Sequence, residues 1–393
     1  MRILLVVDSY SKHTSGGLVA HRTAETLRKA GYVVGIYCAG PANSKQCDEA
    51  DINWYQKYSV SNALRHIWPG EEITEFRKVV DDFKPDVVHF CSFLYTKSRF
   101  FISHALAAGV RVVLQPWIYD FLCEQMYDYH NGQPCGLCSS GDFLHSVFNR
   151  CGVPRNLFIH VLSRYLLRGN ALRCHSVLST NKTMDVSLER YGFSKEKIVR
   201  VPLPFDPKRT EELPVCDGRE FIFYGQIRDF KGAHLLQSII TYCPVAMFSL
   251  YPAIFSEGQN LKHVLGQSKL HNARVDIGLN WFSGLAERVA ACRGVLLPSL
   301  WPTATEYVLM EAMGLSKPIV AFDVGAHREI LVNRKNAMVV PRGNVQAFGE
   351  AILELDKDAD LRRKIGYGAR QTFETLTNSK ELLSKLTKAY VGA

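Results

Sequence analysis

Short apolar segments recur along this chain, with longer segments of helical character between them. In the first half they cover residues 2–8, 33–38, 86–89 and 111–115. A short apolar segment bounded by polar residues is typical of a strand that is covered on both faces. Strands that alternate with helices form parallel sheets through right-handed crossovers. The chain is therefore expected to be an α/β protein.

The second half repeats this rhythm, with predicted strands at residues 221–225, 245–251, 294–298 and 319–322. A chain of 393 residues is longer than one hydrophobic core usually serves. Between the halves, residues 202–207 read Pro-Leu-Pro-Phe-Asp-Pro, a stiff segment that suits a hinge. We expect one domain over residues 1–203, a second over residues 204–375, and a C-terminal helix over residues 376–393.

The charge of the chain favours anionic partners. It has 47 Lys and Arg residues against 38 Asp and Glu residues, for a net charge of +9. Nucleotides, anionic lipid surfaces and nucleic acids all fit such a charge. No run of basic residues is interleaved with aromatic ones and no recognition-module signature is present, so nucleic acid is not an expected partner.

Localisation is predicted from the apolar runs and the cysteines. The N-terminal apolar run, residues 3–7, is too short for the core of a signal peptide, and no stretch approaches the roughly 18 apolar residues of a spanning helix. The 11 cysteines are odd in number and scattered, which suits reduced thiols. We therefore expect a cytoplasmic protein without a spanning helix.

Four of the cysteines have a spacing that could serve a metal. Cys123, Cys135, Cys138 and Cys151 form a C-x11-C-x2-C-x12-C set. The central C-x-x-C pair is a common metal knuckle, and four thiolates suit structural zinc or an iron–sulfur centre. Buried free thiols are the alternative.

Two turns that lead from a strand into a helix could bind an anion. Gly16 and Gly17 end the turn after the first strand, and adjacent glycines let backbone amides approach a ligand closely. An ordinary tight turn is the alternative there. In the second half a helix is expected to start near Thr305 or Glu306, with Thr305 as its N-cap, so its first amides form a second anion site.

Three pieces of residues 295–343 resemble the retaining glycosyltransferases of family 4, two-domain enzymes of the GT-B architecture. Glu311-Ala312-Met313 matches the Glu-Ala-Met of their helix, residues 316–318 match the turn that follows, and residues 323–329 match most of their D-x-G-G-x-x-E segment. The resemblance implies a GT-B fold, in which two Rossmann-like domains with parallel sheets face each other across a cleft. It also implies that the C-terminal helix crosses back to the first domain.

The resemblance further implies an activity. Such an enzyme moves a sugar from a UDP-, GDP-, ADP- or TDP-sugar to a hydroxyl of a glycan, lipid-linked or small-molecule acceptor. The anomeric configuration is retained, through front-side attack assisted by the leaving phosphate. No cofactor is required for the chemistry, because a lysine and a helix dipole stabilise the leaving group.

The roles of single residues are likewise implied by the resemblance. Lys231 matches the lysine that clamps the donor diphosphate, so it is the expected catalytic residue, and Asp120 is a candidate for the polar contact to the sugar. His89 and Trp117 are expected on the acceptor side, with a core position as the alternative for His89. The donor site is expected to comprise Gly16, Gly17, Gln226, Arg228, Lys231, Thr303, Ala304, Thr305, Glu306 and Glu311.

Three residues depart from the family pattern: Trp117 stands where the family has His, Gln226 where it has Arg, and Thr303 where it has Glu. One interpretation is an active subfamily in which the hydroxyl groups of Thr303 and Thr305 replace the carboxylate. The other is an inactive scaffold or partner subunit that binds nucleotide or glycan. A sugar phosphorylase or sugar-phosphate synthase on the same fold is a third class.

Residues 155–173 are predicted to form an amphipathic helix with a basic rim that includes Arg164 and Arg168. Such a helix can pack on the sheet while its arginines extend to solvent. Alternatively it docks on anionic lipid at the inner face of the membrane, to reach a lipid-linked acceptor.

Overall fold

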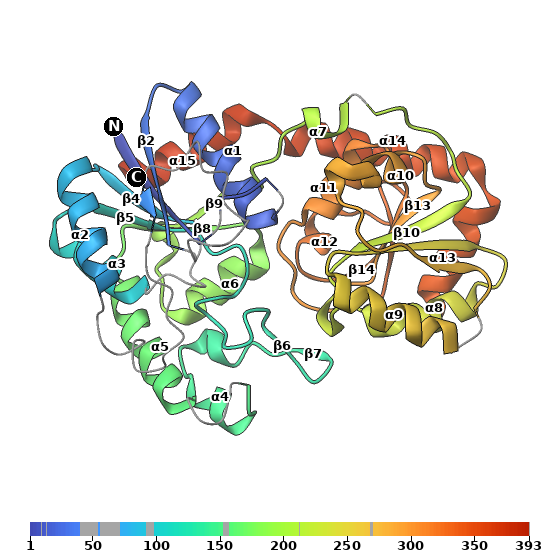
Figure 1. Ribbon diagram of the computed structural model, residues 1–393, viewed down its shortest axis with the longest axis horizontal. Helices are drawn as coiled ribbons and strands as arrows, with labels where there is room; N and C mark the ends of the chain where they lie inside the picture. The colour runs from blue at the N-terminus through green and yellow to red at the C-terminus, as the bar shows by residue number, and fades with distance from the viewer. Residues whose placement is uncertain are drawn as a thin grey trace. The chain divides into compact units, whose positions relative to one another are not determined.

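The chain divides into two compact units, shown in Figure 1. Unit 1 comprises Met1–His130, Cys135–Phe205 and Asn378–Ala393, and unit 2 comprises Asn131–Pro134 and Asp206–Thr377. The computed structural model describes residues 1–8, 10–12, 14–39, 54–55, 71–91, 98–151, 157–211, 213–267 and 270–392.

Unit 1 is built on a seven-stranded sheet in the order β3-β2-β1-β4-β5-β8-β9. All its neighbouring strands run parallel. The strands are β1 (Arg2–Val7), β2 (Val33–Cys38), β3 (Trp54–Tyr55), β4 (Val87–Phe90), β5 (Arg111–Leu114), β8 (Ser176–Ser179) and β9 (Ile198–Arg200). This confirms the predicted parallel sheet of the first half.

Helices cover both faces of this sheet (Figure 1). They are α1 (Ser15–Lys29), α2 (Glu71–Phe83), α3 (Ser98–Ala107), α5 (Leu157–Ala171), α6 (Lys182–Tyr191) and α15 (Ser379–Val391), and α4 (Leu144–Phe148) packs against α5. The sequence predicts a helix from about Thr96 to Ala108, and Thr96 lies outside the described residues. Short elements complete the unit: β6 (Tyr129–His130), η3 (Cys138–Ser140) and η4 (Lys195–Lys197), while β7 (Gln133–Pro134), which pairs with β6, is counted with unit 2.

The core of unit 1 follows the two-residue period of its strands. On one face, Ile36 and Cys38 of β2 lie in a cluster with side chains of α1 and α15. On the other face, Tyr37 of β2 contacts Phe76 of α2 and Phe101 of α3, whose rings stack at 4.4 Å. The alternation of side chains along β2 thus divides the core between the two helical layers.

Unit 2 contains a six-stranded parallel sheet in the order β12-β11-β10-β13-β14-β15. The strands are β10 (Glu220–Gly225), β11 (Met247–Pro252), β12 (Ala273–Val275), β13 (Gly294–Leu297), β14 (Ile319–Phe322) and β15 (Met338–Val340). The described part of the chain therefore has the two parallel α/β sheets that were predicted.

The helices of unit 2 lie on both faces of its sheet (Figure 1). They are α7 (Lys208–Glu211), α8 (Leu236–Tyr242), α9 (Phe255–Gln267), α10 (Ala286–Ala290), α11 (Tyr307–Gly314), α12 (Gly325–Ile330), α13 (Val345–Lys357) and α14 (Ala359–Leu376). Short helical turns are η5 (Asp229–Lys231), η6 (Ala233–Leu235) and η7 (Trp281–Leu285).

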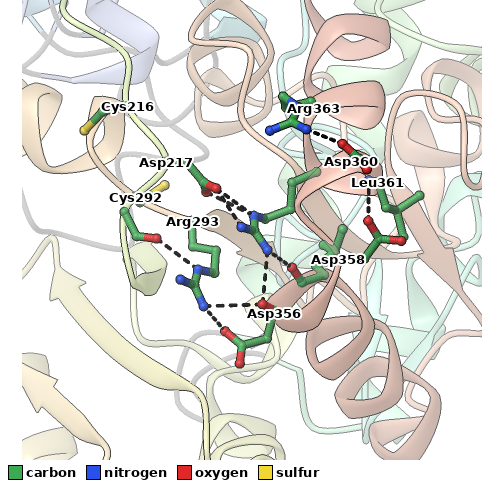
Figure 2. A network of polar contacts seen from close by, with 12 residues as sticks. Cys216, Asp217, Cys292, Arg293, Asp356, Asp358, Asp360, Leu361 and Arg363 are labelled. Atoms are coloured by element: carbon green, nitrogen blue, oxygen red, sulfur yellow. Dashed lines mark hydrogen bonds and ion pairs between the residues drawn. The ribbon is translucent and has the colours of Figure 1, made fainter.

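A polar network fastens the segment that enters β10 to helices α13 and α14 (Figure 2). Arg362 of α14 binds the Asp217 carboxylate through Nη2 at 2.6 Å and the Leu355 carbonyl through Nη1 at 2.6 Å. Arg293 donates to the Gly218 carbonyl at 2.9 Å and contacts the Asp356 carboxylate. The network satisfies carbonyl groups at the ends of elements, which otherwise lack partners.

Lys317, in the turn that precedes β14, is also structural. It is buried, and its ammonium donates to the carbonyl oxygens of Cys216 at 2.6 Å and Cys292 at 2.9 Å. Burial lowers its pKa. In the ranges that the structure describes, no helix combines the length and apolarity needed to cross a membrane.

Candidate functional site

Two loops of unit 2 meet where the strand order reverses. The sheet runs from β10 to β11 on one side and from β10 to β13 on the other, and the loops after β10 and β13 leave this point. In open parallel sheets, ligands bind beyond the carboxyl ends of the strands at such a point. The two loops are joined, because the Leu300 N–H donates to the Phe230 carbonyl at 2.8 Å.

Gly232 sets the close approach of these loops. Its φ of 72° lies in the left-handed region, and a Cβ at this position would lie 1.9 Å from the Pro298 carbonyl oxygen. Only glycine fits such a contact without a shift of the backbone. The preceding Lys231 is thereby held against the loop that follows β13.

The Lys231 ammonium contacts the Glu306 carboxylate and lies 5.4 Å from the centre of the Trp301 ring. Its side chain is 24% exposed, so it remains within reach of a ligand. Burial lowers the pKa of Lys231 to about 7. A lysine with such a pKa can change its charge near neutral pH.

Glu306 is the N-cap residue of α11, but its side chain makes no capping hydrogen bond. The expected N-cap at Thr305 was wrong, because α11 begins at Tyr307. The Glu306 carboxylate instead contacts Lys231 and lies 3.2 Å from His327 Nε2. The Glu306 side chain thus contacts Lys231 and His327, which come from other segments, and does not cap the helix.

His327 of α12 is fully buried behind Glu306. Its Nδ1 lies 3.1 Å from the Phe322 carbonyl oxygen, and because a carbonyl only accepts, Nδ1 carries a proton in this contact. The contact between Nε2 and Glu306 then needs one further proton between them. Burial lowers the pKa of His327 to about 4, so the imidazole is neutral at neutral pH. The Glu306 carboxyl group therefore lies between the Lys231 ammonium and the buried imidazole.

Thr303 lies in the loop between β13 and α11. It is fully buried, and its hydroxyl donates to the Ala304 carbonyl at 2.8 Å. Its own carbonyl accepts from the Ala326 N–H at 2.8 Å, and a Cβ on Gly325 would lie 2.3 Å from its nitrogen. Ala304 is buried and Thr305 is half-buried.

Glu311 is buried in α11 and held by two side chains of unit 2. Arg209 donates to Oε1 through Nε at 2.7 Å and lies 2.7 Å from it through Nη2, while the Tyr224 hydroxyl donates to Oε2 at 3.0 Å. A carboxylate has about four acceptor positions. One of them, on Oε2, has no hydrogen-bond donor among the described residues.

Arg209 itself lies among aromatic rings. Its guanidinium is 4.7 Å from the centre of the Trp281 ring, 5.2 Å from that of Phe282 and 6.0 Å from that of Tyr307. Such contacts hold a planar cation in a fixed orientation. Glu311 is consequently presented in one orientation.

The loop after β10 carries the other predicted donor residues. Gln226 is exposed. Arg228 pairs with Glu257 of α9 at 2.8 Å, and the same carboxylate accepts from the Ile227 N–H at 2.9 Å. Arg228 is 56% exposed along its side chain, so it lies at the surface of this loop.

The predicted glycine turn of unit 1 lies in the first turn of α1. The Thr14 hydroxyl accepts from the Gly17 N–H at 3.2 Å, so that amide is already capped. A Cβ on Gly17 would lie 2.0 Å from the Ser11 carbonyl oxygen, whereas none of the neighbours of Gly16 would be within 4 Å of its Cβ. Tight packing accounts for Gly17, and only Gly16 lies open at the surface.

The predicted acceptor-side residues of unit 1 lie in different surroundings. His89 is fully buried, with Nδ1 2.8 Å from the Tyr390 hydroxyl of α15, and burial lowers its pKa to about 3. His89 thus occupies a core position, which was the alternative expectation for this residue. Trp117 is half-buried, and its indole N–H has no hydrogen-bond partner among the described residues. Asp120 is 7% exposed and accepts from the Phe121 N–H at 3.0 Å.

The four spaced cysteines do not form a metal site. Within the described ranges, no three side chains of the types His, Cys, Asp and Glu gather in a way that could hold a metal ion. Burial raises the pKa of the Cys123 thiol to about 11 and that of Cys138 to about 12, so both are protonated at neutral pH. The structure agrees with the alternative of free thiols, and the prediction of zinc or an iron–sulfur centre has no support.

Two family descriptions match the two halves of this chain. "Glycosyl transferase 4-like domain" matches residues 16–204, and "Glycosyl transferases group 1" matches residues 206–372. The O-antigen chain mannosyltransferase C of Escherichia coli is 22% identical over 175 residues, which are 43% of this chain and 46% of that protein. The chain thus matches less than half the length of this relative.

Solved structures match over the whole chain. The Anabaena protein HepE in complex with UDP has a TM-score of 0.72 at 15% identity, with 99% of each chain covered. The sucrose-phosphate synthase of Thermosynechococcus elongatus has a TM-score of 0.73 at 14% identity, with 99% of this chain and 98% of that chain covered. These likenesses show the fold, which is GT-B. The chain belongs to the GT-B glycosyltransferases of the family 4 type.

Sequence reasoning missed three residues of the candidate site: Arg209, Tyr224 and His327. Tyr224 lies in a buried strand and reads there as an ordinary core residue. Arg209 lies 102 positions before the carboxylate that it binds, so spacing gave no signal. His327 falls inside the D-x-G-G-x-x-E match, where its pairing with Glu306 could have been sought.

Proposed function

We propose that the protein transfers a sugar from a nucleotide-sugar donor to an acceptor hydroxyl, and that unit 2 binds the donor. The observation that carries this proposal is the placement of Lys231, Glu306 and His327 together where the strand order of unit 2 reverses. A partly buried lysine at that place suits a diphosphate, because its ammonium can pair with the phosphate oxygens.

Glu311 is proposed to bind the ribose. Its one remaining acceptor position, on Oε2, can take a hydrogen bond from a ribose hydroxyl, while Arg209 and Tyr224 keep the carboxylate in place. The role of Arg209 is therefore to position Glu311. The exposed ring of Phe282, next to Arg209, is available to a nucleobase.

Lys231 is proposed to be the catalytic residue, because negative charge grows on the diphosphate as the sugar leaves. The first amides of α11 and the exposed side chains of Arg228 and Gln226 add hydrogen-bond donors to the same group. With these donors in place, the chemistry needs neither a metal nor another cofactor. Thr303, Ala304 and Thr305 shape the loop beneath the sugar.

The reaction is proposed to retain the anomeric configuration. The bond between the sugar C1 and the diphosphate oxygen breaks, a bond from the acceptor oxygen to C1 forms on the same face, and the acceptor proton passes to the departing diphosphate. No carboxylate nucleophile is needed for this step. Unit 1 is proposed to hold the acceptor, with the unpartnered indole N–H of Trp117 as a donor to it and Asp120 as a second candidate.

UDP-sugars are the first donors to test, because HepE was solved with UDP and with UDP-glucose. GDP-, ADP- and TDP-sugars complete the panel. Turnover is followed by release of the nucleoside diphosphate with simple glycan and lipid-linked acceptors, and the product's anomeric configuration is read by proton NMR. Transfer with retention supports the proposal, and transfer with inversion contradicts its stereochemical part.

An inactive scaffold that binds nucleotide or glycan is the second candidate. It is favoured by one observation, the burial of the Thr303 hydroxyl against the Ala304 carbonyl, which turns it toward the main chain and not toward a sugar. Saturable donor binding without transfer or slow hydrolysis of any donor would support the scaffold over the enzyme.

A further inference from the structure

Six large apolar side chains of unit 1 are exposed on two neighbouring helices. Phe148 is 80% exposed, far above the others. The set consists of Leu144, Val147 and Phe148 of α4 and of Leu162, Tyr165 and Leu166 of α5. Single exposed apolar residues are common, but a contiguous group of them marks a binding surface.

The two rows of side chains lie on helices that contact each other. In each helix the three residues are spaced i, i+3 and i+4, so they lie on one side of it. The helices touch near the start of α4, where the Tyr165 hydroxyl donates to Asp142 at 2.9 Å and the Tyr165 ring lies 5.3 Å from that of Phe143. Figure 1 shows α4 and α5 next to each other in unit 1. We call this surface the α4–α5 face.

The sequence that carries this face is basic between its two flanking aspartates. Between Asp142 and Asp185 the sequence contains neither Asp nor Glu. The same stretch contains the basic residues Arg150, Arg155, Arg164, Arg168, Arg173 and Lys182.

Two of these arginines have structural partners. Arg164 is paired with Glu124 at 2.7 Å, and Arg168 donates to the Tyr191 carbonyl at 2.8 Å. Arg150 and Arg173 are exposed, each two residues beyond the end of its helix, and Arg155 lies outside the described residues. Two exposed cations thus follow the ends of α4 and α5, while the acidic residue at this face is Asp142, which binds Tyr165.

We propose that the α4–α5 face docks on the surface of an anionic lipid bilayer. Phe148 and Leu144 enter the boundary between headgroups and acyl chains, and Arg150 and Arg173 meet the phosphate groups. Apolar burial and attraction to anionic headgroups are the two terms that hold an interfacial helix in place. A second copy of the chain is a poorer occupant, because it would bring a surface of the same positive charge against this one.

The experiment is co-sedimentation of the whole protein with vesicles. One set contains phosphatidylcholine alone, and the other also contains roughly a third phosphatidylglycerol, enough to give an anionic surface. The apolar variant is Leu144→Ser with Phe148→Ser. Its matched control is Val186→Ser on α6, since Val186 is 46% exposed in the same unit and Leu144 is 49% exposed. All these side chains are at the surface, and circular dichroism checks that each variant is folded.

The charge variant is Arg150→Gln with Arg173→Gln, and its control is Arg363→Gln on α14, whose side chain is 73% exposed. We expect the wild type to bind the anionic vesicles and not the neutral ones. The apolar variant should lower the partition coefficient by about tenfold or more, and the charge variant by about tenfold. Both controls should leave it unchanged.

Three results would overturn the proposal. The first is a wild type that binds neither set of vesicles. The second is equal loss of binding in the apolar variant and in Val186→Ser. The third is self-association of the wild type that the apolar variant abolishes while vesicle binding is absent, which would assign the face to a second copy. None of these outcomes depends on sugar transfer, so the result stands apart from the proposed activity.

Discussion

Glu306 places a carboxyl group beside Lys231 at a position that differs from the one in the family pattern. The family pattern has a Glu at position 303, where this chain has Thr303. Glu306, three residues later, contacts both Lys231 and His327. The structure therefore supplies a carboxylic group beside the lysine from a different position.

Glu311→Ala is expected to weaken nucleotide binding by about 1 to 3 kcal/mol, the usual effect of losing a charged hydrogen-bond partner. Calorimetric titration with the nucleotide that the wild type binds measures the change in affinity. Thermal unfolding measures the stability that is lost because Arg209 no longer has its partner. The matched control is Glu354→Ala, since Glu354 also pairs with an arginine but is 39% exposed along its side chain. Unchanged affinity in Glu311→Ala would mean that the ribose site lies elsewhere.

Donor affinity is expected to depend on pH through Lys231. Its pKa of about 7 lies below the ordinary value for lysine, so the ammonium is present below pH 7 and is lost as the pH rises through it. An anionic diphosphate binds the ammonium form, and affinity should thus fall by up to about tenfold per pH unit above 7. Titrations between pH 6 and about 8.5 test this.

The control for this pH series is the uncharged nucleoside, whose affinity should not follow the charge of Lys231. A nucleotide-sugar affinity that stays flat, or that rises with pH, would contradict the assignment of the lysine to the diphosphate.

At the scale of elements, the strands were the predictable part. The strands β1, β2, β4, β5, β10, β11, β13 and β14 are short apolar segments, and parallel pairing follows from the helices between them, whereas β3, β12 and β15 were not predicted. The local sequence pattern did not predict the correct N-cap of α11, because the Glu306 side chain contacts residues from distant parts of the chain. The same holds for Arg209, Tyr224 and His327, whose roles exist only once the elements have packed. The α4 helix carried no signal that was recognised.

The turn into α1 offers a paired test of what its two glycines do. A Cβ on Gly17 would meet the Ser11 carbonyl oxygen at 2.0 Å, so Gly17→Ala should destabilise unit 1 by about 2 kcal/mol or more. Gly16→Ala meets none of its neighbours and should change stability by less than about 0.5 kcal/mol. Denaturant unfolding of both variants gives the comparison. Equal effects of the two substitutions would show that the turn is not packed as described.

At the scale of the whole molecule, the organisation into two sheets was predictable from the chain length and from the alternation of predicted strands and helices. The resemblance to family 4 was drawn from residues 295–343. The helix α15 belongs to unit 1 because of its packing, and the sequence of the helix alone does not predict that packing. Leu382, Leu386, Ala389 and Tyr390 belong to one core cluster with β1, β2 and α1. The final helix therefore completes the core of the unit that contains the N-terminus.

Leu386→Ala is expected to destabilise unit 1 by about 2 to 5 kcal/mol, the usual cost of a cavity at a fully buried leucine. Hydrogen exchange followed by mass spectrometry should show faster exchange in β1, β2 and β4, with β10 and β13 unchanged. Leu383→Ala, at a partly buried position beside the same cluster, is the control and should have a smaller effect. Equal acceleration in both units would show that they unfold as one.

The central claim is that unit 2 binds a nucleotide sugar through Lys231. Calorimetric titration of the wild type and of Lys231→Met with UDP-, GDP-, ADP- and TDP-sugars tests it most directly. We predict saturable binding of at least one donor, weakened about tenfold or more in Lys231→Met, because that substitution removes the charged partner of the diphosphate. Absence of saturable binding for all four donors, or equal affinity in the two proteins, would contradict the claim.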